Sequence, residues 1–68
     1  MTINAKIIAA YKRTLEADNN DAEYSTSSTK RAATRAANAL SRHIHAANPD
    51  MTVREKIALR TELMTSHS

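Results

Sequence analysis

The chain has 68 residues, of which 25% are charged, and its formal net charge is +3. This length allows one domain, spanning residues 1–68, which buries only about 60% of the surface that the unfolded chain exposes. The sequence contains no cysteine and no glycine, which excludes disulfides and cysteine nucleophiles and argues against glycine-rich phosphate-binding loops. No apolar run approaches the roughly 18 residues of a membrane span, and the first residues lack the apolar core of a signal peptide. We therefore expect a cytoplasmic protein.

Alanine dominates the hydrophobic composition. Of the 28 hydrophobic residues, 13 are alanine, whereas leucine, isoleucine and valine together number only 10. The predicted core is therefore thin, and a second copy or a partner is expected to add buried surface. Alanine, lysine, arginine, glutamate and leucine all favour helices. The composition predicts an all-α, three-helix domain that forms a helical-bundle homodimer.

The first helix is predicted over residues 3–17. Isoleucine and leucine side chains at Ile3, Ile7 and Leu15 gather on one face, and charged side chains occupy the other. Asp18-Asn19-Asn20-Asp21 is a run of turn and capping residues, which predicts the end of this helix. Residues 18–29 are then expected to form a polar loop or the frayed start of the next helix, because consecutive hydroxyl side chains compete for backbone hydrogen bonds.

A long alanine-rich helix is predicted to start between residues 22 and 28 and to end at 47, because Asn48-Pro49 cannot continue it. Thr52 and Glu55 have the spacing of a capping box, which predicts a third helix over residues 53–64, followed by a flexible tail at 65–68. The relative lengths suggest that the first and third helices each cover one half of the central helix.

The central helix carries basic residues and no acid. Arg31, Arg35 and Arg42 form one ridge on the helical wheel, with His45 beside it. Such a ridge can follow the phosphates of a nucleic acid, which makes these four residues candidate nucleic-acid contacts. The alternative interpretation is a solvated helix exterior whose charges suit the helix dipole.

Two helix faces are candidates for contact with a partner protein. Alanines of the central helix allow another helix to approach closely, and the third helix carries two apolar edges separated by Lys56 and Arg60. The bases either extend to water over packed stems, or Arg60 pairs with an acid across an interface. The candidate protein interface comprises Ala36, Ala39, His43, Lys56, Leu59, Arg60 and Leu63.

No pattern for catalysis, a cofactor or a metal is recognised in the sequence. His43 and His45 lie two positions apart, so on a helix they point in opposite directions and cannot share a metal ion. We expect a non-enzymatic interaction protein, a regulator or inhibitor that binds another protein and itself through helix faces, without a membrane or small-molecule ligand. In size and in the lack of catalytic motifs it is similar in general character to small accessory proteins of bacteriophages and mobile elements. The alternative is a nucleic-acid-binding protein.

Overall fold

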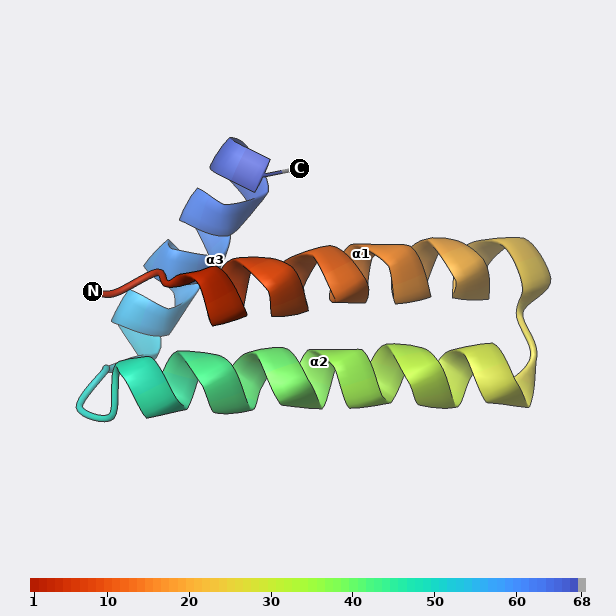
Figure 1. Ribbon diagram of the computed structural model, residues 1–68, viewed down its shortest axis with the longest axis horizontal. Helices are drawn as coiled ribbons and strands as arrows, with labels where there is room; N and C mark the ends of the chain where they lie inside the picture. Colours follow the sequence, from red (N-terminus) through yellow and green to blue (C-terminus); the bar gives the residue numbers. More distant parts are fainter. Residues whose placement is uncertain (68) are drawn as a thin grey trace.

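The computed structural model describes residues 1–67, which form three α-helices and no strand. Helix α1 spans Ala5–Tyr24, α2 spans Ser27–Ala47 and α3 spans Val53–His67. Helices α1 and α2 lie side by side and antiparallel, and α3 crosses α1 near the N-terminal end of α1 (Figure 1). The prediction of an all-α, three-helix fold is confirmed, and the homodimer stays a prediction.

Helix α1 continues to Tyr24 rather than ending at Ala17, so most of the polar loop predicted for residues 18–29 is helical. Packing against α2 overrides the weak helix propensity of the aspartates and asparagines in this stretch. Ala17 and Asp21 are half-buried, and the Asp21 carboxylate accepts a hydrogen bond of 3.0 Å from the Thr29 hydroxyl of α2. As a result α1 lies along the whole of α2, and the predicted division of α2 between two short helices is wrong.

The hydroxyl residues between α1 and α2 end one helix and cap the next. Ser25 has φ 48° and ψ 45°, in the left-handed region, and its N–H donates to the Asp21 carbonyl at 2.8 Å. The Thr26 hydroxyl accepts from the Thr29 N–H at 3.2 Å, and the Thr29 hydroxyl accepts from the Thr26 N–H at 2.9 Å. This reciprocal capping box starts α2 at Ser27 without a frayed turn.

The second connection follows the prediction closely. Helix α2 ends before Asn48-Pro49, where proline prevents continuation. The capping box at the start of α3 is confirmed, because the Glu55 N–H donates to the Thr52 hydroxyl at 3.2 Å and Glu55 Oε1 accepts from the Thr52 N–H at 3.3 Å.

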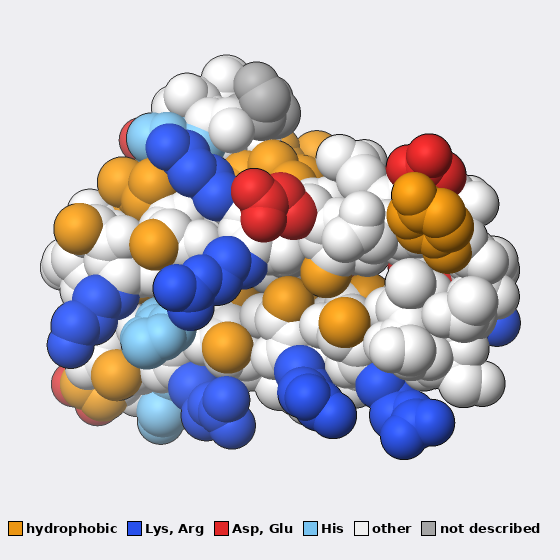
Figure 2. All heavy atoms as spheres, turned by 45° about the vertical axis from the view of Figure 1, so that its right-hand side comes forward, with side chains coloured by type: hydrophobic (Ala, Val, Ile, Leu, Met, Phe, Trp, Pro, Cys, Tyr) orange, Lys and Arg blue, Asp and Glu red, His pale blue; other side chains and the backbone are white. Residues whose placement is uncertain are grey.

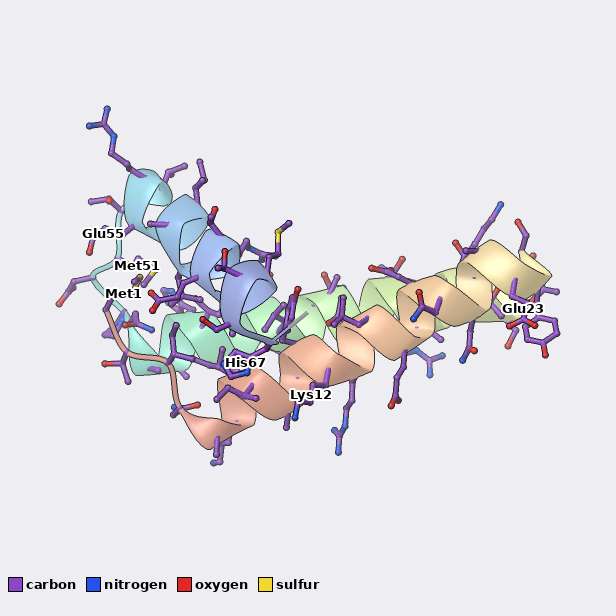
Figure 3. The ribbon with its side chains drawn as sticks, turned by 90° about the horizontal axis from the view of Figure 1, so that it is seen from above. Met1, Lys12, Glu23, Met51, Glu55 and His67 are labelled. Carbon is purple, nitrogen blue, oxygen red and sulfur yellow. The ribbon has the colours of Figure 1, made fainter. Side chains whose placement is uncertain are left out.

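The N-terminal segment is tied to this second connection. The Asn48 side chain accepts a hydrogen bond from the Thr2 N–H and donates one to the Thr2 carbonyl. Met1 and Met51 line the same small hollow, and Glu23 lies at the opposite end of the molecule (Figure 3). The N-terminal segment therefore lies against the connection between α2 and α3, at one end of the α1–α2 hairpin.

Helix α3 extends beyond its predicted end at residue 64. It continues through His67, so the part of the predicted flexible tail 65–68 that the structure describes is helical, and residue 68 lies outside the described residues. The hydroxyls of Thr61 and Thr65 donate to carbonyls four positions earlier, at 2.9 Å each. Both side chains therefore bond within the helix rather than disturbing it.

The hydrophobic core lies where all three helices meet, at the end of the hairpin away from the loop between α1 and α2. Its buried members are Ile7, Ala10, Tyr11, Leu40, Ile44, Leu59 and Leu63. Towards that loop, α1 and α2 pack on each other mainly through small residues such as Ala33 and Ala37, both half-buried. The fold therefore has a well-packed end and a thinly packed end.

Candidate functional site

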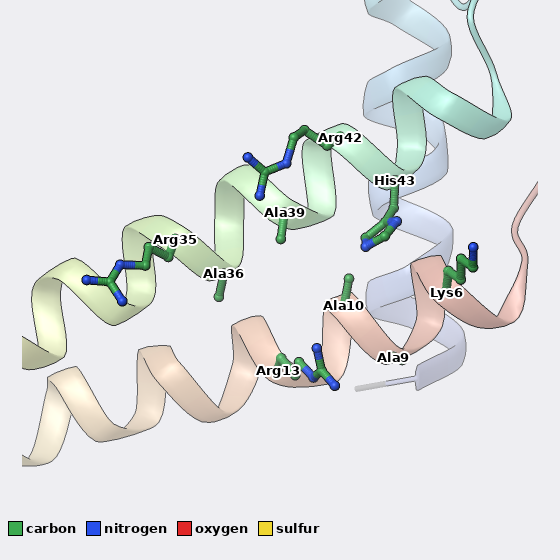
Figure 4. A pocket seen from close by; sticks show the side chains of 9 residues that line it. All are labelled: Lys6, Ala9, Ala10, Arg13, Arg35, Ala36, Ala39, Arg42 and His43. Carbon is green, nitrogen blue, oxygen red and sulfur yellow. The ribbon is translucent and has the colours of Figure 1, made fainter.

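A groove of about 520 Å³ runs along the α1–α2 hairpin. Both helices contribute side chains to it, as Figure 4 shows. The lining residues are Lys6, Ala9, Ala10 and Arg13 of α1 and Arg35, Ala36, Ala39, Arg42 and His43 of α2. We call this site the basic groove.

The floor of the basic groove consists of alanine methyl groups. Ala9 and Ala10 come from α1, and Ala36 and Ala39 come from α2. Ala10 is buried, Ala36 and Ala39 are half-buried, and Ala9 is exposed. Because alanine side chains end at Cβ, the two backbones lie close together and the surface above them is hollow and apolar.

The rim of the basic groove is positively charged. Lys6, Arg13, Arg35 and Arg42 account for four of the ten lysines and arginines in the chain, and all four are exposed. Figure 2 shows lysine and arginine side chains on both sides of a strip of small hydrophobic side chains. No acidic residue lines the groove, although Glu16 lies one helical turn beyond Arg13. The rim therefore concentrates charge of one sign around an apolar floor.

The predicted protein interface is only partly assembled. Ala36, Ala39 and His43 come together in the basic groove, and His43 is half-buried there. Leu59 and Leu63 are instead fully buried in the core of their own chain, so they offer no surface to a partner. The sequence pattern shows that α3 has two apolar edges, but it does not show which edge faces the core.

The other apolar edge of α3 is exposed. Val53 is 73% exposed, Ile57 62% and Met64 59%. Of the two bases between the edges, Lys56 is exposed, while Arg60 Nη2 donates to Ser41 Oγ of α2 at 3.0 Å. Arg60 thus has a polar partner within its own chain, whereas the two sequence-based alternatives were a head group in water and an acid of a partner protein.

The candidate nucleic-acid contacts lie partly on the same site. Arg35 and Arg42 stand on the rim of the basic groove, and Arg31 borders an adjoining hollow of about 200 Å³ that Arg35 shares. His45 is exposed but lines neither hollow. Arg35 and Arg42 of the ridge thus belong to one wall of a two-walled groove, and Arg31 lies beyond it.

Sequence reasoning missed the contribution of α1 to this site. Lys6 and Arg13 supply the opposite wall, and Ala9 and Ala10 supply half of the floor. The helical wheel of a single helix cannot show which of its polar residues will border a neighbouring helix. The available signal was the seven-residue spacing of Lys6 and Arg13, which equals that of Arg35 and Arg42.

In residues 1–67, no group of three or more histidine, aspartate or glutamate side chains is placed to bind a metal ion. Within the same residues, none of the helices has the length and apolarity needed to cross a bilayer. Comparisons with protein-family models, curated proteins and solved structures find no match to the chain.

Proposed function

We propose that the chain is a small, non-enzymatic, cytoplasmic binding protein that regulates or inhibits another protein by holding an acidic segment of it in the basic groove. The observation that carries the proposal is the combination of an alanine floor with a rim of four cations. In size and in the lack of catalytic motifs the protein is similar in general character to the small accessory proteins of bacteriophages and mobile elements. Self-association as a homodimer is a further part of this proposal.

The two parts of the basic groove favour a ligand with both apolar and acidic groups. Burial of the ligand's apolar surface on the floor is favourable by roughly 25 cal/mol for each Å². The rim attracts carboxylates and directs the approach of an acidic partner, an effect that weakens as salt screens the charges. A ligand with only one of the two properties would leave part of the groove unused.

Affinity capture from the lysate of the cells that carry the gene tests this proposal. The double variant Arg13→Glu with Arg42→Glu removes cations from both walls of the basic groove. The control, Lys12→Glu with Arg54→Glu, makes the same change in charge at exposed positions that do not line the groove. The lysate is treated with nuclease so that nucleic acid cannot bridge two proteins.

We expect the wild-type and control chains to retain the same acidic proteins and the groove variant to lose them. Equal capture by the groove and control variants would contradict the proposal. Capture of acidic proteins from an untreated lysate but not from the nuclease-treated one would contradict it as well.

Nucleic-acid binding is the second candidate function, and the exposed ridge of Arg31, Arg35 and Arg42 favours it. Phosphate contacts would use the rim but not the apolar floor, which is why we rank this function lower. The two candidates differ in salt dependence, because phosphate binding weakens steeply between about 50 and about 300 mM salt. Binding with a large apolar share weakens much less.

A further inference from the structure

We infer that the segment held in the basic groove is an amphipathic α-helix with a narrow stripe of small or apolar side chains and carboxylates on both flanks. This inference rests on the proposed function and adds the shape and charge pattern of the ligand. It follows from the floor of the groove, the spacing of its cations and their presence on both walls.

The cations are spaced by two helical turns on each wall. Lys6 and Arg13 on α1 are seven residues apart, and so are Arg35 and Arg42 on α2. Seven residues of an α-helix correspond to about 10.5 Å along its axis. Each wall therefore presents two positive charges that match acids seven residues apart on a neighbouring helix.

The two walls also run in opposite directions. Because α1 and α2 are antiparallel, the side chains of the two walls extend in opposite directions along the groove: Lys6 and Arg13 point towards one end of it, and Arg35 and Arg42 point towards the other (Figure 4). A ligand centred on the floor would meet cations on both of its flanks. Acids on one flank only would reach half of the rim.

A helix fits this arrangement better than an extended strand. Helix diameters with side chains are about 10 to 12 Å, and helix pairs approach to about 8 to 10 Å when small residues lie between them. A third helix resting on Ala9, Ala36 and Ala39 would form a three-helix arrangement with α1 and α2. Its inner stripe would meet the floor, while flanking acids at heptad spacing would meet the walls, as charged flanking positions do in coiled coils. In a strand, side chains on one face recur every second residue, about 7 Å apart, and do not match the walls.

A second copy of this chain matches the groove less completely. Glu16 and Glu23 of α1 and Glu55 and Glu62 of α3 have the seven-residue spacing, but each pair forms a single row on its helix, and Glu55 also caps α3. Either row can face only one wall. We therefore assign the groove to a helix of a different protein and treat self-association through the groove as an outcome of the test.

The test uses two synthetic helical peptides of about 21 residues with identical composition, long enough to pass all four cations. The first carries an alanine and leucine stripe with glutamates at seven-residue intervals on both flanks. The first peptide also carries glutamines on the face opposite the stripe. In the second peptide the stripe is the same, but the glutamates and these glutamines exchange places. Circular dichroism confirms equal helicity, and fluorescence anisotropy measures each affinity at about 150 mM salt.

We expect the first peptide to bind at least about tenfold more tightly than the second, since four exposed ion pairs each contribute a modest factor. Lys6→Gln and Arg35→Gln should each weaken it about two- to fivefold, and Lys12→Gln should leave it unchanged. Equal affinity of the two peptides, with dependence on Lys6 and Arg35, would overturn the helical pattern but retain the acid-binding groove.

Other outcomes would bear on the proposed function itself. If neither peptide binds, or if the groove variants change nothing, the proposed function fails as well. Sedimentation of the chain without peptide tests whether it self-associates. A dimer that dissociates on Lys6→Gln and competes with the first peptide would replace the foreign helix with a second copy. Displacement of the first peptide by an equal concentration of DNA duplex would favour phosphate binding instead.

Discussion

The side-chain amide of Asn48 pairs with both backbone groups of Thr2. Asn48 Oδ1 accepts from the Thr2 N–H at 2.6 Å, and Asn48 Nδ2 donates to the Thr2 carbonyl at 2.9 Å and to the Ile44 carbonyl at 3.1 Å. One side chain thus caps α2 and holds a segment 46 positions away in the sequence. It connects the N-terminal segment to the end of the hairpin that contains the core.

This pairing predicts that Asn48→Asp is more damaging than Asn48→Ala. Aspartate keeps the acceptor for the Thr2 N–H but places a negative oxygen against the carbonyls of Thr2 and Ile44. The dipole of α2 also opposes a negative charge at the C-terminal end of the helix. We expect a loss of about 2 to 3 kcal/mol of unfolding free energy for Asn48→Asp and about 1 kcal/mol for Asn48→Ala. Urea unfolding measures both, with the exposed Asn38→Asp in the middle of α2 as control. Equal losses for the two Asn48 variants would show that its donor bonds do not matter.

The two apolar edges of α3 are expected to respond very differently to truncation. Leu59 is fully buried in the core, whereas Ile57 is 62% exposed. Leu59→Ala should cost about 2 to 5 kcal/mol, enough to unfold much of a chain this small. Ile57→Ala should change stability by no more than about 0.5 kcal/mol. Thermal unfolding followed by circular dichroism compares them, and similar losses would mean that α3 packs through its other edge.

Ser25 is expected to be replaceable by glycine with a gain in stability. Its left-handed backbone conformation is unfavourable for a residue with a Cβ atom, and glycine adopts it without that penalty. After allowing for the greater freedom of glycine in the unfolded chain, we expect Ser25→Gly to add about 0.5 to 1 kcal/mol. Ser25→Val should destabilise, because branching at Cβ worsens the same clash. If chemical denaturation shows valine and glycine variants of equal stability, the described turn between α1 and α2 is wrong.

Hydrogen exchange should distinguish the two ends of the α1–α2 hairpin. Near Ile7 and Ile44 the backbone is covered by the three-helix core, whereas residues 16–23 and 28–34 lie in the half that α3 does not reach. Amides in the core half should exchange close to the rate of global unfolding, and amides in the other half should exchange much faster through local opening. Uniform protection along α1 and α2 would contradict this division.

Sequence patterns predicted those features that depend on a few neighbouring residues. Proline at 49 ends α2, and the spacing of Thr52 and Glu55 starts α3, because each acts through local sterics or hydrogen bonds. The extent of α1 was not predictable in this way. Asp21 is a turn-forming residue in isolation, and it remains helical because Thr29 of α2 lies within hydrogen-bond distance.

In the candidate site, too, local features could be predicted and features that depend on helix packing could not. Arg35 and Arg42 could be placed on one helix face from their spacing, as could Ala36 and Ala39. That Arg13 faces them from α1 depends on how the two helices pack, which no single-helix pattern contains. The burial of Leu59 likewise depends on which edge of α3 meets the hairpin.

The central claim is that the basic groove is the binding surface, and chemical-shift mapping by NMR tests it most directly. An ¹⁵N-labelled chain is titrated with the peptide that carries glutamates on both flanks. We predict the largest amide shifts at Ala9, Arg13, Ala36, Ala39 and His43, with little change at Val53 and Ile57. Shifts concentrated on the exposed edge of α3, or scattered over basic residues outside the groove, would contradict the account.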